Sequence, residues 1–297
     1  MSHVGTNLAE LISRHVIALL FTSFLLLLGT VLLVLVIGRL FWKRRSVVWS
    51  LVAKGISRIG RIGIVANVRK RFPGVFGFLG RLTPQAFLEV YLLAGLLVSM
   101  GIVFFSVLAE EIAEKSSLVA FDHQLAAALQ NTWTPRFVLG FSRVTVLGGG
   151  IGLAVIGAGV GLILLLRKER SLLIGWVVAT LGASALTMVL KAIFQRVRPE
   201  YAHMSSWSFP SGHSMGSFVT YGMLTYVCSR YMPDWAAWVI GAGLLLLVLF
   251  IGFSRLYLGV HYFSDVIAGY SVAMVWLAVC ISGTEIARLR EKARRSA

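Results

Sequence analysis

The polar residues that decide the fold and the function are concentrated in three stretches: KAIFQRVRP at residues 191–199, PSGH at residues 210–213 and SRLYLGVHYFSD at residues 254–265. They contain four cations and two histidines, namely Lys191, Arg196, Arg198, Arg255, His213 and His261. Long apolar blocks surround all three stretches. Ionisable side chains among membrane segments usually mark a functional site, so the pattern predicts a site that handles an anion.

The composition is typical of a polytopic membrane protein. The chain has 297 residues, of which 58% are hydrophobic and only 13% charged, and its mean hydropathy is +0.84. A soluble domain carries about 25% charged residues. The apolar residues form continuous blocks rather than one amphipathic stripe, so the sequence predicts an all-α protein with several membrane helices.

The apolar and basic blocks divide the chain into four parts. Residues 1–42 are predicted to form an N-terminal transmembrane helix with its N-terminus outside, because a basic cluster follows the apolar block. Residues 43–84 are predicted to form a basic amphipathic linker on the cytoplasmic surface, and packing of this linker on the other helices is an equal alternative. Residues 85–284 are predicted to form a catalytic core, and residues 285–297 a basic cytoplasmic tail. The core is predicted to have six membrane helices, at residues 87–109, 144–166, 171–194, 213–229, 235–253 and 262–281.

The net charge of +16 is concentrated in clusters beside the apolar blocks. Ten Lys or Arg residues and no acidic residue lie between residues 43 and 81, and the C-terminal residues are also basic. Such clusters follow the positive-inside bias, favour anionic lipids as partners of the linker and the tail, and argue against nucleic acid. With these clusters in the cytoplasm, the predicted helices place the three polar stretches on the outer face, which is periplasmic in a bacterial inner membrane. Cations on that disfavoured side are better explained by a ligand.

The cations and the PSGH stretch suit phosphate. Arginine offers a forked set of donors that matches phosphate oxygens, and lysine offers a point charge. Pro199 disfavours helix at Arg198, so the preceding helix is expected to end near Val197. Ser211 is predicted to cap the next helix, and Gly212 lets the backbone approach a ligand. Ordinary helix capping would explain the serine but not the histidine beside it, whereas the free N–H groups of a helix N-terminus also bind anions.

His261 and Asp265 are four residues apart at the start of a predicted helix, so their side chains are neighbours. An aspartate that holds one ring nitrogen leaves the other free to act as a base or a nucleophile. Glu200 and Asp265 are the only acidic residues in the two outer loops. A two-metal phosphatase needs a cluster of carboxylates and histidines, so the sequence predicts chemistry with no metal and no cofactor.

Other features receive structural interpretations. Asp122 and His123 are expected in a surface loop, since adjacent residues on a helix do not face each other. Glycines at residues 148–150, 152, 157 and 161 are interpreted as helix-packing positions, because no P-loop pattern surrounds them. Cys228 and Cys280 are expected to be small buried hydrophobic residues.

In order and spacing, the three stretches resemble the signature of the type 2 phosphatidic acid phosphatase (PAP2) superfamily, which includes integral-membrane lipid phosphatases and vanadium haloperoxidases. The resemblance covers about residues 87–281. It implies that His261 attacks phosphorus to form a phosphohistidine, that Asp265 orients it, and that His213 protonates the leaving oxygen. It also implies that the phosphate is bound by Lys191, Arg198, Ser211, Gly212 and Arg255. Arg196 and Glu200 lie outside the signature and stay possible substrate contacts.

The resemblance and the predicted topology favour a lipid phosphatase of the outer leaflet. Its expected substrate is a phosphorylated or diphosphorylated lipid, first undecaprenyl diphosphate, then phosphatidylglycerol phosphate, phosphatidic acid and lipid A phosphate. A phosphotransferase is an alternative, because a phosphohistidine can pass its group to an alcohol. A vanadium haloperoxidase and a non-catalytic lipid-binding or transport protein are the competing classes.

Overall fold

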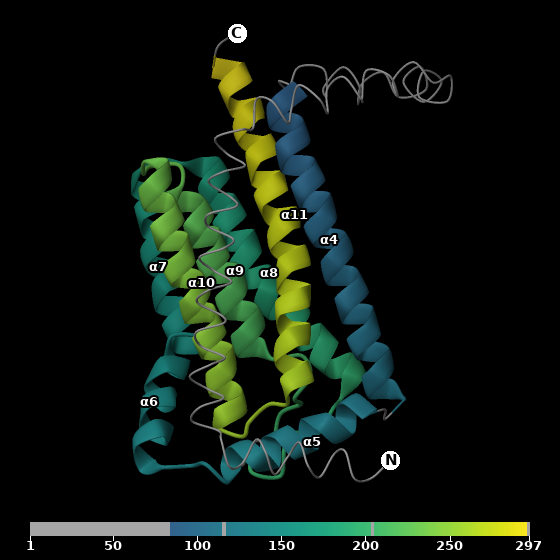
Figure 1. Ribbon diagram of the computed structural model, residues 1–297. Coiled ribbons are helices and arrows are strands. Elements are labelled where there is room, and N and C mark those ends of the chain that lie inside the picture. Colours follow the sequence, from purple (N-terminus) through teal and green to yellow (C-terminus); the bar gives the residue numbers. More distant parts are fainter. Residues whose placement is uncertain (1–83, 115–116, 203–204, 296–297) are drawn as a thin grey trace, which may run out of the picture. The chain divides into compact units, whose positions relative to one another are not determined.

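The structure is a computed structural model that describes residues 84–114, 117–202 and 205–295 (Figure 1). The N-terminal helix predicted at residues 1–42 and nearly all of the predicted linker lie outside these residues. The described parts are helical, with no strand among them, as the sequence predicted. The helices are α4 Pro84–Ala113, α5 Ser117–Gln130, α6 Pro135–Val146, α7 Gly150–Leu166, α8 Arg170–Phe194, α9 Gly212–Cys228, α10 Asp234–Tyr257 and α11 Phe263–Arg295. The chain divides into two compact units, and the contacts described below lie in the unit that contains Leu97–Ala297.

Four helical stretches in the described part of the chain are long and apolar enough to cross a membrane. They are Pro135–Leu166, Arg170–Phe194, Asp234–Tyr257 and Phe263–Glu291. Large apolar side chains on their surfaces are exposed, for example Ile151 at 83% and Val155 at 67%. Burying such surface in lipid removes it from water, which is favourable. The predicted number of crossings stays a prediction, since these stretches are identified by length and composition alone.

Helix α9 lies among α8, α10 and α11 and packs against all three (Figure 1). Its side chains are mostly small, polar or flexible, and Met215, Val219 and Met223 are fully buried. Small residues let membrane helices approach closely. Gly222 faces Leu277 of α11 at a distance that leaves no room for a methyl group. Close packing therefore holds α9 against α11.

Two tryptophans, the buried Trp176 and the partly buried Trp276, tie α8 to its neighbours. The indole N–H of Trp176 donates to the carbonyl of Gly157 on α7 at 3.0 Å. The indole N–H of Trp276 on α11 donates to the carbonyl of Ala179 on α8 at 2.9 Å. A buried indole needs such a partner, so each ring fixes both the spacing and the register of two helices.

The helix predicted at residues 144–166 is divided by a turn. Helix α6 begins after Thr134, whose hydroxyl accepts from the N–H of Phe137 at 3.4 Å, and it ends at Val146 before the glycines of the turn. Gly148 packs against Ile251 of α10, as the packing interpretation predicted, but nothing lies within 4 Å of a methyl group placed on Gly157. At the other end of the chain, α11 continues to Arg295, so the predicted tail extends this helix.

Candidate active site

Helix α8 ends at Phe194, earlier than the expected end near Val197, because Gln195 adopts a left-handed conformation with φ of 45°. The chain then turns away from the helix axis, and Ser208 comes to lie beside Arg196. The N–H of Ser208 donates to the carbonyl of Arg196 at 2.8 Å, and its hydroxyl donates to the same carbonyl at 3.1 Å. Lys191, on the last turn of α8, donates to the carbonyls of Trp207 and Ser208. The loop therefore keeps the first polar stretch against the segment that leads to the second.

The second stretch caps α9 as predicted. The hydroxyl of Ser211 accepts from the N–H of Ser214 at 3.4 Å. The N–H of Ser211 donates to the carbonyl of Asp265 at 2.9 Å. A methyl group on Gly269 of α11 would lie 2.8 Å from the carbonyl oxygen of Ser211, so this glycine permits the approach. The PSGH stretch is thus fastened to the first turns of α11.

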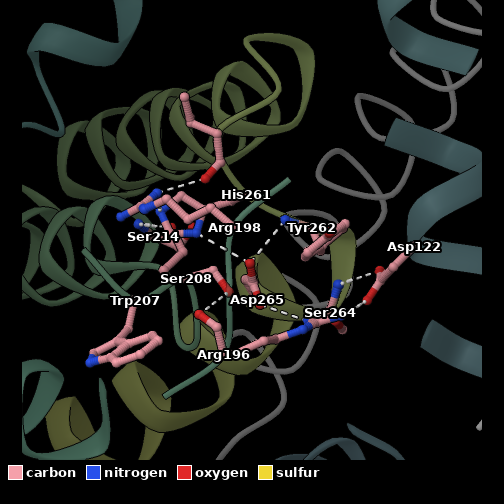
Figure 2. Close-up of polar contacts among 12 residues, drawn as sticks. Asp122, Arg196, Arg198, Trp207, Ser208, Ser214, His261, Tyr262, Ser264 and Asp265 are labelled. Carbon is pink, nitrogen blue, oxygen red and sulfur yellow. Dashed lines mark hydrogen bonds and ion pairs between the residues drawn. The ribbon is translucent and has the colours of Figure 1, made fainter. Parts of the chain in front are cut away.

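The third stretch places His261 in the loop between α10 and α11 (Figure 2). Its Nδ1 lies 3.3 Å from Oδ2 of Asp265, and the same carboxylate oxygen accepts from the N–H of Tyr262 at 2.9 Å. A guanidinium nitrogen of Arg198 lies 3.1 Å from Nε2 of His261 and donates to the carbonyl of Val260 at 2.6 Å. Arginine has only donors, so Nε2 carries the lone pair and Nδ1 the proton. This is the tautomer that a nucleophilic Nε2 requires.

The surroundings of His261 favour its neutral form. The side chain is buried, and burial is the largest effect on its pKa. The hydrogen bond to Asp265 and the charge of Asp265 raise the pKa, while the charges of Arg198 and Arg255 lower it. The result lowers the pKa of His261 from the usual 6.5 to about 4. The imidazole is therefore neutral at physiological pH.

Among Lys191, Arg198 and Arg255, Arg255 makes the fewest hydrogen bonds to the described residues. Its side chain is buried on the last turn of α10, and one guanidinium nitrogen donates to the hydroxyl of Thr145 on α6 at 2.8 Å. Its Nε is buried and has no hydrogen-bond partner among the described residues. An unpaired buried donor is costly, and an anion oxygen would satisfy it. The arrangement fits the predicted role of Arg255 in binding phosphate.

The turn between α6 and α7 also lies beside the site, which the sequence interpretation missed. A methyl group on Gly149 would lie 3.4 Å from Nε2 of His213. Thr145 from the same segment holds Arg255. The glycines were interpreted as packing positions because no phosphate-binding pattern surrounds them, and no local signal points from them to a histidine in a different helix.

Arg196 and Asp122 occupy places that differ from the predictions. Arg196, expected as a possible substrate contact, donates to Oδ1 of Asp265 and to the hydroxyl of Ser264, both at 2.7 Å. Its other terminal nitrogen donates to Oδ2 of Asp122 at 2.8 Å. The surface-loop prediction for Asp122 was wrong, because this residue lies in α5 and is 1% exposed. Its partners are remote in sequence, so local spacing gave no sign of them.

Glu200, the other possible substrate contact, lines a cavity of about 250 Å³ together with Arg198, Ser205, Ser206 and Trp207. Ser206 accepts from the Nε of Arg198 through its carbonyl at 2.7 Å. One side of the cavity is therefore formed by a residue of the site. The described residues contain no group of three or more His, Cys, Asp or Glu side chains that could hold a metal ion.

Comparisons with known proteins agree with the resemblance. The PAP2 superfamily model matches residues 172–287, which include all three polar stretches. Phosphatidylglycerophosphatase B of Bacillus subtilis (strain 168) is 38% identical over 117 residues, which are 36% of this chain and 56% of that protein. Undecaprenyl-diphosphatase of Sulfolobus acidocaldarius is 30% identical over 134 residues, which are 41% of this chain and 61% of that protein. The chain thus spans little more than half the length of the curated relatives it matches.

A solved structure is similar over a larger part. The crystal structure of a transmembrane PAP2-type phosphatidylglycerolphosphate phosphatase from Bacillus subtilis has a TM-score of 0.58 at 27% identity. The similarity covers 63% of this chain and 96% of that one. With its long apolar helices and these relatives, the chain is an integral membrane protein, and the region that holds its candidate active site matches the PAP2 superfamily.

Proposed function

We propose that this protein is a metal-independent lipid phosphatase that acts through a phosphohistidine on His261. One observation carries the proposal: Nδ1 of His261 lies 3.3 Å from Oδ2 of Asp265, and Nε2 lies 3.1 Å from a guanidinium nitrogen of Arg198. Because arginine only donates, this geometry leaves the lone pair on Nε2. Nucleophilic catalysis needs a nucleophile with a free lone pair and a group that orients it. Both are present beside the buried Arg255.

The proposed reaction has two steps. Nε2 of His261 attacks phosphorus while the bond from phosphorus to the leaving oxygen breaks, and His213 donates a proton to that oxygen. Water then attacks the phosphohistidine, giving a proton to His213 and returning the electron pair to Nε2. Lys191, Arg198, Arg255 and the N–H groups at the start of α9 stabilise the charge on the other phosphate oxygens. The geometry of Arg255 supports this step, since its buried Nε lacks a partner among the described residues.

The proposed substrate is a phosphorylated lipid, with undecaprenyl diphosphate first. Exposed apolar side chains on the long helices support a substrate whose tail stays in the bilayer. One relative is named for undecaprenyl diphosphate. Two others are named for phosphatidylglycerol phosphate, which makes that lipid the second candidate. The charge distribution supports a periplasmic site and a cytoplasmic C-terminus in a bacterial inner membrane.

Phosphate release from a panel of lipids tests the proposal. The full chain is purified in detergent and given undecaprenyl diphosphate, phosphatidylglycerol phosphate, phosphatidic acid and lipid A phosphate in excess chelator. We expect phosphate release from at least one lipid, and none from a His261→Gln variant. Activity that disappears with chelator would contradict the metal-independent mechanism. Adding an alcohol separates hydrolysis from phosphotransfer, and halide oxidation by peroxide with vanadate would indicate the haloperoxidase class.

A further inference from the structure

Behind the catalytic pair lies a buried ionic network centred on Arg196 (Figure 2). Its guanidinium bridges two carboxylates, Oδ1 of Asp265 at 2.7 Å and Oδ2 of Asp122 at 2.8 Å. Both carboxylate side chains are 0% exposed, and the side chain of Arg196 is 10% exposed. The guanidinium also lies over the ring of Tyr262 at 4.4 Å. Arg196 therefore faces away from bulk water and towards the support of the active site.

Asp122 is also held by hydrogen bonds from Ser264, in addition to its contact with Arg196. Its Oδ1 accepts from the N–H of Ser264 at 3.1 Å, and its Oδ2 accepts from the hydroxyl of Ser264. Ser264 also accepts from Arg196 through that hydroxyl at 2.7 Å. The carboxylate of α5 thus contacts both the arginine and the residue directly before Asp265. Hydrogen bonds directly from Ser264 and through Arg196 therefore fix the first turn of α11 to α5.

The network determines which oxygen of Asp265 faces the histidine. Arg196 takes Oδ1, while Oδ2 is left for Nδ1 of His261 and the N–H of Tyr262. A planar guanidinium has donors in a fixed fork, so it fixes the plane of the carboxylate as well as its position. A carboxylate without this partner could rotate about its side-chain bonds and lose the contact with Nδ1.

Helix α5 is held against the same loop at its other end. The indole N–H of Trp133 donates to the carbonyl of Tyr257 at 2.6 Å, and the hydroxyl of Tyr257 donates to the carbonyl of Thr132 at 2.8 Å. Leu129 of α5 packs against Tyr257 in a buried cluster. The loop that carries His261 is therefore fixed to α5 on both sides.

We propose that Arg196 and Asp122 are positioning residues, which act through Asp265 to hold His261 ready for attack on phosphorus. The proposal rests on the proposed function. It assigns Arg196 to the catalytic support and not to the substrate, and it gives α5 a role in the reaction although no residue of α5 belongs to the three polar stretches.

The test is a double-mutant cycle with Asp265, measured as phosphate release from phosphatidylglycerol phosphate and undecaprenyl diphosphate by the full chain. Arg196→Lys keeps the charge but loses the fork. We expect it to lower kcat by about 100-fold with little change in KM, the size of loss that a misplaced reacting group causes. In an Asp265→Asn background, Arg196→Lys is expected to change kcat by no more than about twofold, because residues that act through one group are not additive.

Asp122→Asn provides a second route to the same result. It keeps the shape of the side chain and removes the charge that Arg196 contacts. Its effect on kcat is expected to disappear in the Asp265→Asn background as well. Should Arg196→Lys yield no folded protein, Asp122→Asn decides the question alone. Arg230→Lys is the matched control, because Arg230 pairs with Glu285 at 3.3 Å beyond the opposite end of α9, and kcat should keep its wild-type value.

The outcomes separate this inference from the proposed function. Equal losses of kcat in both backgrounds would mean that the network only stabilises the fold, and a raised KM with normal kcat would mean that Arg196 binds substrate. Either result overturns the inference while the phosphatase assignment stands. Wild-type protein that releases no phosphate from any lipid of the panel contradicts both.

Discussion

A guanidinium nitrogen of Arg198 lies 3.1 Å from Nε2 of His261, on the opposite side of the ring from Asp265. Because arginine only donates, the contact requires an unprotonated Nε2. Arg198 is held at this place by the carbonyls of Ser206 and Val260. In the proposed reaction, the entering phosphate takes over the N–H that points at Nε2, which would free the lone pair for attack on phosphorus. In the proposed mechanism, Arg198 would keep His261 neutral before substrate binds and would stabilise the phosphate afterwards.

Arg255, in the last turn of α10, should be needed for the chemical step. Arg255→Ala removes the buried Nε and the donor to Thr145. We expect a loss of about 2.7–4 kcal/mol of transition-state stabilisation, comparable to the removal of an oxyanion donor. The measurement is kcat/KM for phosphate release, with Arg230→Ala as the control far from the site. Near-normal activity of Arg255→Ala would show that the phosphate is bound elsewhere.

The pH dependence should reflect the lowered pKa of His261. Protonation removes the nucleophile, so activity falls as the pH drops through this pKa, which burial lowers to about 4 in the free protein. Because His213 has to carry a proton to act as the acid in the substrate complex, a basic limb is expected in kcat. The acid limb of kcat/KM, corrected for ionisation of the substrate phosphate, should lie well below the usual histidine value. An acid limb at about 6.5 would contradict the assignment of His261.

The turn between α6 and α7 should limit the space beside His213, the proposed general acid. Gly149→Ala places a methyl group 3.4 Å from Nε2 of His213 and 3.3 Å from the carbonyl oxygen of Val146. The methyl group competes with the leaving oxygen for this space, so we expect kcat to fall by about tenfold or more, as for other displacements of a reacting group. Gly157→Ala on the next helix is the control, since nothing lies within 4 Å of its methyl group. Equal activity of both variants would place the leaving group elsewhere.

Helix packing away from the site should be sensitive to a single methyl group. Gly182 of α8 faces the ring of Trp276 with no room for a methyl group. Gly182→Ala must displace a ring whose N–H is bonded to Ala179, which should cost about 1–3 kcal/mol of unfolding free energy. The thermal midpoint in detergent measures the effect. Gly159→Ala has open space and should be neutral or slightly stabilising, because alanine favours helix over glycine. The same midpoint for the two variants would contradict the packing described here.

The sequence predicted the parts of the site that depend on local spacing. His261 and Asp265 are neighbours because they are four residues apart, and Ser211 caps α9 because it precedes an apolar helix. The membrane span predicted at residues 171–194 ends where α8 ends, but the helix end expected near Val197 was too late, because the left-handed residue at the turn is Gln195 and not a glycine. Asp122 could not be connected with Arg196 or Ser264, because their contacts depend on how α5 packs against the loops. Whether a charged residue such as Asp122 is buried depends on tertiary packing. The residues next to it in the sequence therefore do not reveal which side chains it contacts.

Trapping the phosphorylated intermediate tests directly whether His261 is the nucleophile. The full chain is mixed with a lipid carrying a radiolabelled terminal phosphate, in excess chelator, and quenched at early times in base. We expect label on His261 of the wild-type protein and none on the His261→Gln variant. The label should be stable in base and labile in acid. Phosphate release by His261→Gln at the wild-type rate, or label attached to another residue, would contradict this assignment of the nucleophile.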